Sequence, residues 1–493
     1  MNAVRAASAR LADVGVRRTA WPLNVLNVLL ALVGAVALRY ALGLSPLWWM
    51  AWVAPLPLLI AVARAGRVET ALLATVAGLI GASVNLDYFT IVMGRPAALG
   101  VIALQALAWT LILSLARRVM VKHTGWPAML AYPLLWAAFD LVSTRFLPDG
   151  NWGSLGYAQA DYLPAVQIVA LGGVPLLMFT LSLPASALAL LIVRGRPAWP
   201  GVAIALVLAG ASLALGAQRL TAPLQAGTPI GLAAIDDAIG PGASAVYAER
   251  IWQRYEQLIA ELAGRGARIV VLPEKIAMLG PPQNPHALQQ RLARAAARAR
   301  AQVWLVAGIG YQEQGARYNR GWLFSPTGAL VQDYEKQRMA PPERAFVRGH
   351  VPAIQAMDDT RLGLAICKDM HFADVGRGYA QHAVQAMAVP AWDFTLDGQY
   401  AARLSALRGI EGGFAMARAS RDGVLTVTDA YGRILAETAT APMPGASLLA
   451  RLPAGAPKQT LYTRTGDAFG WLALAWCVMT LAWRRQRRAV DGS

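Results

Sequence analysis

The chain has 493 residues, of which 56% are hydrophobic and 15% carry a charged side chain. Soluble domains contain about 25% charged residues, so the composition disfavours a single soluble globule, and the high hydrophobicity excludes a disordered chain. The two cysteines, Cys367 and Cys477, lie far apart, which argues against a disulfide framework or a CxxC metal site. The composition therefore indicates a membrane protein of two or three domains.

Long apolar runs predict seven membrane-spanning helices in the first half of the chain and one more near its end. Each run is close to the roughly 20 residues that cross a bilayer, allowing for tilt. The predicted spans are 22–40, 46–63, 70–93, 97–116, 125–143, 164–193, 200–217 and 467–483. Arginines precede the first span as in a signal peptide, but no small-residue cleavage site follows it, so we expect this helix to be retained.

Lysine and arginine are unequally distributed between the two alternating sets of connecting segments. One set carries Arg39, Arg95 and Arg145 only. The other carries fifteen basic residues, namely Arg5, Arg10, Arg17, Arg18, Arg64, Arg67, Arg117, Arg118, Lys122, Arg194, Arg196, Arg484, Arg485, Arg487 and Arg488. By the positive-inside rule the richer set is cytoplasmic, so both termini are predicted inside and residues 218–465 outside. Much of the net charge of +17 is explained in this way, and nucleic acid is not an expected partner.

We therefore divide the chain into an N-terminal membrane domain (1–217), a soluble domain (218–465), and a last transmembrane helix with a basic cytoplasmic tail (466–493). In the soluble domain, amphipathic segments alternate with short apolar runs, which predicts an α/β layered fold. Helices are expected over 247–264, 285–301 and 398–411. Strands are expected over 269–272, 302–309, 319–325, 329–334, 361–366, 384–390, 413–418 and 423–428.

Three reactive side chains follow predicted strands, where α/β folds place their chemistry. Glu274, Lys336 and Cys367 together suffice for acyl transfer. Glu274 could take the thiol proton, since the thiolate is the nucleophile, and Lys336 with the backbone N–H of Lys368 could stabilise an oxyanion. Each residue alone has an ordinary structural explanation, so the hypothesis depends on their order and placement.

These residues stand in motifs that resemble those of the nitrilase (carbon–nitrogen hydrolase) superfamily. LPE (272–274), DYEK (333–336), PPE (341–343) and LAICKDM (364–370) resemble its glutamate, lysine, second-glutamate and nucleophile motifs. AVPAWDF (388–394), RLSALRGIEGG (403–413) and DAYGRIL (429–435) resemble the segment that follows. The resemblance implies a four-layer αββα sandwich with Glu274, Lys336 and Cys367 as catalytic residues, supported by Glu343 and Lys368.

The membrane half resembles a narrower family. Residues 149–174 (DGNWGSLGYAQADYLPAVQIVALGGV) are similar to the WxxxGYxQ…GG segment of apolipoprotein N-acyltransferases, which share the predicted arrangement of about eight spans. This resemblance implies transfer of a fatty acyl chain from a phospholipid, through a cysteine thioester, to the N-terminal amine of a diacylglyceryl-cysteine lipoprotein. It also implies a multi-pass protein of the bacterial inner membrane with a periplasmic catalytic domain. We expect a monomer.

An acyl substrate requires an apolar cleft beside the thiol. Trp392 and Phe394 could line this cleft or be ordinary core aromatics, and Trp152 and Tyr157 could contact the lipid head group or brace the soluble domain. His371 and Cys477 are expected to be packing residues. Because no His/Cys cluster has ligand spacing, neither a metal nor an organic cofactor is expected.

The sequence also departs from the family pattern. Lys368 and Asp369 follow the cysteine where the family has an aromatic and an acidic residue, and Lys275 follows the first glutamate in place of a small residue. These departures leave open a membrane-anchored amidase, or another acyltransferase with a different substrate. A non-catalytic scaffold or transporter is disfavoured, because the triad is complete and the spans contain few charges.

Overall fold

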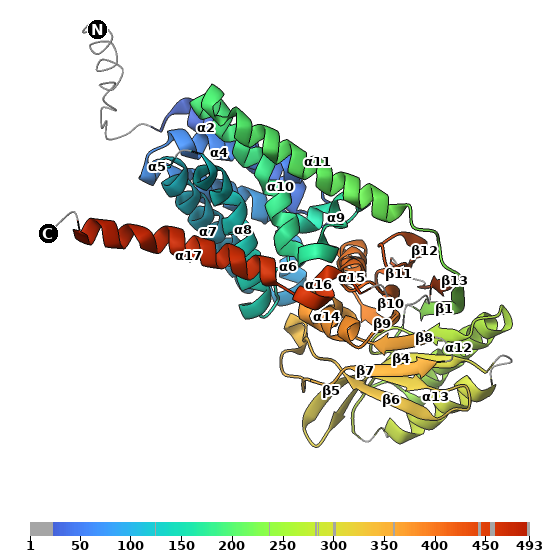
Figure 1. Cartoon of the computed structure of the whole chain (residues 1–493). Coiled ribbons are helices and arrows are strands. Elements are labelled where there is room, and N and C mark those ends of the chain that lie inside the picture. The colour runs from blue at the N-terminus through green and yellow to red at the C-terminus, as the bar shows by residue number, and fades with distance from the viewer. Residues whose placement is uncertain are drawn as a thin grey trace, which may run out of the picture.

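The computed structural model describes residues 23–490, apart from residues 124, 236, 282, 284, 299–301, 358–359, 442–444 and 454–458. The four N-terminal arginines that contribute to the predicted orientation lie outside the described residues. Figure 1 shows two regions, a bundle of long helices built from the first half of the chain and a layered α/β region. The C-terminal helix α17 (Ala468–Val490) returns from the α/β region and packs beside the bundle.

Every predicted span coincides with helical structure. The helices of the bundle are α2 (Val25–Leu42), α3 (Met50–Val53), α4 (Pro55–Arg64), α5 (Arg67–Ala82), α6 (Leu86–Met93), α7 (Arg95–Met120), α8 (Trp126–Phe146), α9 (Leu163–Val166), α10 (Val169–Arg194) and α11 (Trp199–Leu220). Among the described residues, five helical stretches are long and apolar enough to cross a membrane. They are Val25–Leu42, Arg67–Met93, Arg95–Met120, Val169–Arg194 and Arg196–Leu220, and shorter apolar helices cover Met50–Arg64 and Ala468–Thr480.

The single span predicted over 164–193 is divided by a kink within α10. Gly173 has φ +68, a left-handed conformation that favours glycine. A Cβ atom at Gly173 would lie 2.6 Å from the ring of Tyr462, which belongs to the short helix α16 (Leu461–Thr465). The glycine thus leaves room for α16, the segment that precedes α17, to dock on the bundle.

The α/β region contains two sheets. The first has the strand order β13-β1-β2-β4-β5-β6, with β3 paired to β4, and the second has the order β12-β11-β10-β9-β8-β7. Their bounds are β1 (Gly227–Ile235), β2 (Ile269–Val271), β3 (Ala277–Leu279), β4 (Trp304–Glu313), β5 (Ala316–Phe324), β6 (Leu330–Glu335), β7 (Ala353–Met357), β8 (Thr360–Leu364), β9 (Ala386–Trp392), β10 (Ala415–Arg421), β11 (Val424–Thr428), β12 (Ile434–Ala439) and β13 (Gly445–Pro453). In each sheet three adjacent strands run parallel, β1-β2-β4 in the first and β8-β9-β10 in the second.

The two sheets share one buried core, so the region is layered. Side chains from both sheets, including Ile230, Val306, Leu364 and Ala417, meet in this core. Helices α12 (Ala245–Gly264) and α13 (Pro285–Arg298) cover the outer face of the first sheet, and α14 (Ala373–Gln381) covers that of the second. The order of layers is helix, sheet, sheet, helix, as the sequence resemblance implies.

All eight predicted strands and all three predicted helices are present, with shifts of a few residues at their ends. The predicted elements do not include β1, β3, β7, β12, β13 and α14. The last three residues predicted for the helix over 285–301 lie outside the described residues.

Helix α15 (Gly398–Gly412) joins the α/β region to the bundle. Its side chains Tyr400, Leu404, Leu407 and Ile410 belong to the same buried cluster as the bundle helices. This packing fixes the second sheet, which carries Cys367 just beyond β8, relative to the bundle.

Candidate active site

Cys367 lies at a sharp turn just after β8. Its φ is +44, a conformation rarely adopted by residues other than glycine, and it begins the short 3₁₀ helix Cys367–His371. The buried Asp369 carboxylate stabilises this turn. Its Oδ2 accepts hydrogen bonds from the Ile366 N–H at 2.9 Å and the Tyr334 hydroxyl at 2.7 Å. Its Oδ1 accepts from the N–H groups of Gln337 and Arg338, so the turn is tied to the segment just after Lys336.

Glu274 follows β2 and contacts both sheets through its backbone. Its N–H donates to the carbonyl of Ala391 in β9. A Cβ atom at Gly308 of β4 would lie 2.5 Å from the Glu274 Cα, so glycine at this position permits the close approach. The neighbouring elements therefore fix where the carboxylate enters the site.

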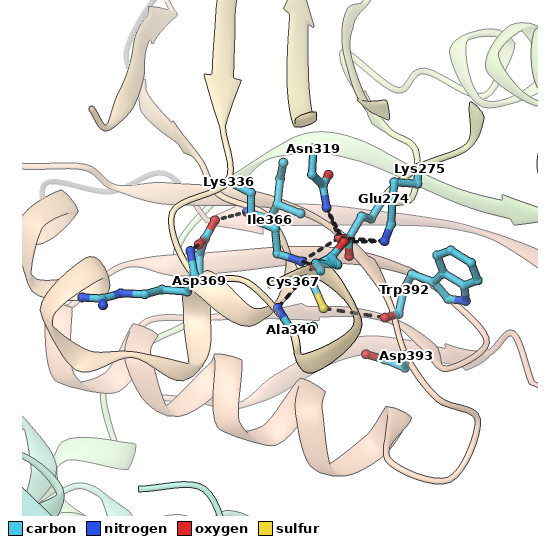
Figure 2. A network of polar contacts seen from close by, with 12 residues as sticks. Glu274, Lys275, Asn319, Lys336, Ala340, Ile366, Cys367, Asp369, Trp392 and Asp393 are labelled. Carbon is cyan, nitrogen blue, oxygen red and sulfur yellow. Dashed lines mark hydrogen bonds and ion pairs between the residues drawn. The ribbon is translucent and has the colours of Figure 1, made fainter. Parts of the chain in front are cut away.

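Lys336 bridges two carboxylates (Figure 2). Its Nζ donates to Glu274 Oε1 and to Glu343 Oε2, both at 2.7 Å. The Asn319 amide donates to the same pair, to Glu274 Oε1 at 2.5 Å and to Glu343 Oε1 at 2.8 Å. Lys275 forms an ion pair with Glu343. The Glu274 and Lys336 side chains are only 2% and 1% exposed, so two carboxylates and two ammonium groups balance in a nearly dry site.

The electrostatics keep Lys336 and Glu343 charged but the Cys367 thiol neutral. Burial lowers the pKa of Lys336, but Glu274 and Glu343 raise it by more, so this pKa lies well above its usual range. Burial raises the pKa of Glu343, but Lys336 and Lys275 lower it by more, so the pKa of this carboxyl lies well below its usual range. Burial and, to a lesser extent, Glu274 raise the pKa of Cys367 to about 12. The resting cysteine is therefore a protonated thiol that requires a base.

The surroundings of the sulfur complete the site. Sγ lies 3.7 Å from the carbonyl oxygen of Trp392 and 4.0 Å from Nη2 of Arg418. Arg418 pairs with Asp393, and Ser420 donates to the same carboxylate at 2.7 Å. The predicted site residues do not include Arg418, Asp393 or Asn319. Only Asp393 had a signal, since it stands within the AVPAWDF motif.

One cavity of about 710 Å³ contains Glu274, Lys336 and Cys367 in its wall. Its opposite wall is built from the helical bundle and is mainly apolar. From α7 it contains Ala97, Val101, Leu104, Gln105, Ala108 and Trp109, and from α8 Trp136, Phe139, Asp140 and Ser143. Thus a cavity that begins at the thiol continues between helices predicted to lie in the membrane.

Three of the four predicted substrate-binding residues, Trp152, Trp392 and Phe394, line this cavity. Trp152 stacks on Tyr88 with ring centroids 5.0 Å apart. The fourth, Tyr157, does not line it. Its ring is buried, and its hydroxyl donates to Asn151 Oδ1 at 2.6 Å, so Tyr157 braces the loop that carries Trp152.

Lys368 and Lys275, which depart from the family pattern, both form ion pairs. Lys368 forms an ion pair with Asp149, which lies in the connection between α8 and the Leu155–Gln159 turn, and Asp149 also pairs with Arg344 at 2.9 Å. Burial lowers the pKa of Lys368, and the Asp149 carboxylate partly opposes this. Lys275, besides pairing with Glu343, lies 4.9 Å from the ring centroid of Trp392. His371 also lines the cavity.

Within the described residues, no group of three or more His, Cys, Asp or Glu side chains could hold a metal ion.

Two family models match the chain. Residues 238–442 match "Carbon-nitrogen hydrolase", and residues 34–187 match "Apolipoprotein N-acyltransferase N-terminal domain". Together these matches span well over half of the chain.

Several curated proteins are similar over nearly the whole length. The apolipoprotein N-acyltransferase of Geobacter metallireducens is 26% identical over 93% of this chain and 96% of its own. The apolipoprotein N-acyltransferase of Gloeobacter violaceus is 27% identical over 94% of this chain and 96% of its own. The human omega-amidase NIT2 is 28% identical over 37% of this chain and 76% of its own. Among solved structures, an amidase from Nesterenkonia sp. AN1 aligns with a TM-score of 0.41 and 20% identity, covering 50% of this chain and 96% of its own.

The N-terminal domain model matches the helical bundle, and the carbon–nitrogen hydrolase model matches the α/β region. Residues of both regions line the cavity. The chain belongs to the apolipoprotein N-acyltransferase-like membrane proteins of the carbon–nitrogen hydrolase (nitrilase) superfamily.

Proposed function

We propose that the protein transfers a fatty acyl chain from a phospholipid to the N-terminal amine of a diacylglyceryl-cysteine lipoprotein, through a thioester on Cys367. The observation that carries this proposal is the shared cavity, whose wall contains the thiol on one side and the apolar faces of α7 and α8 on the other. The full-length similarity to apolipoprotein N-acyltransferases supports the same reaction.

In the first half-reaction, Glu274 takes the proton of the Cys367 thiol while Sγ attacks the ester carbonyl of the phospholipid. The Lys336 ammonium, with the backbone N–H of Lys368, stabilises the oxyanion that develops on the carbonyl oxygen. When the tetrahedral intermediate collapses, the carbon–oxygen bond breaks and Glu274 returns the proton to the departing alkoxide. The products are a lysophospholipid and the acyl thioester.

In the second half-reaction, the lipoprotein amine attacks the thioester carbonyl. Glu274 accepts the proton that the amine loses, the carbon–sulfur bond breaks, and the proton passes to the sulfur. Because the pKa of Cys367 is raised to about 12, the resting cysteine is a protonated thiol, and proton removal is coupled to substrate attack. Glu343 supports both steps by keeping Lys336 charged and in place.

The aromatic residues in the wall are assigned by their positions. Trp392, Phe394 and Trp152 contact the acyl chain close to its carbonyl, and Tyr157 holds the Trp152 loop. No metal or organic cofactor is required for this chemistry, since a carboxylate, an ammonium group and a thiol supply base, oxyanion stabilisation and nucleophile.

The proposed reaction also requires a particular arrangement of the chain in the membrane. Residues 1–217 and 466–493 form the membrane domain of about eight spans, and residues 218–465 form the catalytic domain. The catalytic domain lies on the periplasmic side of a bacterial inner membrane, with both termini cytoplasmic and the protein a monomer. The Asp149 ion pairs support this orientation, because they join the catalytic domain to a connection predicted to lie outside.

Intact mass spectrometry tests the relay directly. The purified protein is incubated with phospholipid and then with a diacylglyceryl-cysteine peptide. The proposal predicts a gain of one acyl mass, absent in Cys367→Ala and present in the matched control Cys477→Ala, and its transfer to the added peptide.

The alternative is a membrane-anchored amidase or another acyltransferase, which the similarity to an omega-amidase over 37% of the chain favours. Release of the acyl group to water alone, or hydrolysis of a small amide without any acyl adduct, would contradict N-acyl transfer and select this alternative.

A further inference from the structure

The apolar wall of the cavity follows one face of each of two helices. On α7 the lining residues are Ala97, Val101, Leu104, Gln105, Ala108 and Trp109, and on α8 they are Leu147 just past its end, Ser143, Asp140, Phe139 and Trp136. Spacings of three and four residues place side chains on one helix face. The cavity therefore runs along α7 and α8 as a channel.

The direction and depth of this channel follow from the helix geometry. Ala97 and Leu147 lie at the ends of α7 and α8 that adjoin the α/β region, where the neighbouring Asp149 contacts Lys368. The helices run in opposite directions, so Trp109 and Trp136 both lie at the far end. At a rise of 1.5 Å per residue, the lining face of each helix is about 17 Å long.

The far end is closed by two indole rings. Trp109 and Trp136 pack with ring centroids 4.5 Å apart and an interplanar angle of 62°, and they are only 3% and 5% exposed. Trp136 packs in turn against Phe139 and Tyr132. The next inward-facing residues of α7, Ile112 and Leu113, belong to the closed core of the bundle. The residues that line the channel thus end at Trp109 on α7 and at Trp136 on α8, which contact each other.

We infer that Trp109 and Trp136 form the floor of the acyl pocket and set the longest acyl chain that the enzyme transfers efficiently. This inference rests on the proposed function. Each methylene that enters the channel gains apolar contact, and a chain long enough to reach the indoles has no further space. A methylene that fits or fails to fit in such a pocket changes selectivity by about tenfold or more.

Two substitutions shift the floor in opposite directions. Trp109→Ala removes an indole and deepens the channel. Ala108→Leu adds a larger side chain at the preceding lining position of α7 and makes the channel shallower. Trp471→Ala is the matched control, because Trp471 lies on α17 and is 48% exposed on the outer surface of the bundle. None of the three changes the thiol, the base or the lysine.

The experiment offers each protein an equimolar mixture of phospholipids that differ only in acyl length and measures the ratio of acyl-adduct masses on Cys367. Trp109→Ala should raise the long-to-short ratio at least tenfold, Ala108→Leu should lower it, and Trp471→Ala should match the wild type.

Wild-type length profiles in both channel variants, with adducts still formed, would overturn the inference while leaving the acyl relay intact. A wild-type protein that forms no adduct with any phospholipid would overturn the proposed function and the acyl pocket together.

Discussion

The two walls of the cavity are built in contrasting ways. The wall from the α/β region holds Glu274, Lys275, Lys336 and Glu343 in a nearly dry network of short hydrogen bonds beside the thiol. The wall from α7 and α8 is mainly apolar, with aromatic side chains and few polar groups. The four charged groups of the first wall are paired with one another, whereas the second wall acts mainly through its apolar shape.

This difference assigns separate tasks to the two walls. Fixed charges aimed at one sulfur atom determine which bond is made, and they act on any substrate that reaches the thiol. An apolar channel contributes binding energy in proportion to the surface it buries, so it selects among substrates. Changes in the first wall should therefore lower the rate for all acyl chains alike, and changes in the second should alter which chain is preferred.

The largest expected effect is that of Glu274→Gln. Removing the general base while keeping the side-chain shape should lower the rate of acyl-adduct formation about 10² to 10⁴-fold. The loss should be equal for long and short acyl chains, as measured by mass spectrometry over time. A loss confined to one chain length would show that Glu274 acts on substrate selection and would break the contrast between the walls.

The raised pKa of Cys367 predicts a strong pH dependence of its alkylation in the free enzyme. Because burial and Glu274 raise this pKa to about 12, the thiolate fraction should increase about tenfold per pH unit, so iodoacetamide labelling should rise from pH 7 to 10 without a plateau. In Glu274→Gln the rise should begin at lower pH, since one cause of the shift is removed. A plateau near pH 8 in the wild type would contradict a protonated resting thiol.

Lys275 should stabilise the protein through Glu343. Lys275→Met removes one of the two ammonium groups that lower the pKa of Glu343, and the lost charged hydrogen bond is worth about 2 kcal/mol. The pKa of Glu343 is lower in the folded than in the unfolded protein. Its contribution to stability is therefore complete at pH values above the unfolded-state pKa. The contribution is lost as the pH falls toward the folded-state pKa. The stability difference between wild type and Lys275→Met should thus be full at pH 7 and shrink below about pH 4.

Thermal unfolding in detergent at a series of pH values measures this difference, with Lys275→Arg as the charge-preserving comparison. A difference that is the same at pH 3 and pH 7 would show that Lys275 acts by packing on Trp392 alone.

The smallest expected effect concerns the contact between the two regions. Asp149 pairs with Lys368 and Arg344, and its side chain is 32% exposed, so each pair is worth about 1 kcal/mol or less. Asp149→Asn and Lys368→Met should each slow adduct formation a few-fold, and the double variant should be no slower than either. Additive losses in this cycle would show that the two residues act independently.

The sequence predicted the features that depend on local patterns. Apolar runs located the helices of the bundle, and within the described residues five helical stretches are long and apolar enough to cross a membrane. The motifs around Glu274, Lys336 and Cys367 located three side chains that the fold brings to one cavity. The missed strands had weak local signals. For example, β1 contains glycine and proline, and the half-exposed β12 and β13 lack a continuous apolar run.

Other features depend on contacts between distant residues and left no local signal. Asn319 is an ordinary polar residue of β5 until the fold places it between two carboxylates 45 and 24 residues away. The partner of Lys368 is 219 residues distant in the membrane half, so its ion pair with Asp149 could not be read from the sequence. For Tyr157 the sequence left open a head-group contact or a bracing role. The residue lies outside the cavity lining, and its hydroxyl donates to Asn151.

The most direct test is to locate the acyl chain while it is attached to the thiol. The wild-type protein is loaded from a phospholipid that carries a photoreactive diazirine near the methyl end of its acyl chain, irradiated, digested and mapped by mass spectrometry. The shared cavity predicts cross-links from Cys367 to residues 104–109 of α7 and 136–143 of α8, absent in Cys367→Ala. Cross-links from Cys367 only to residues outside the cavity, such as the exposed Leu206 and Val207 of α11, would contradict it.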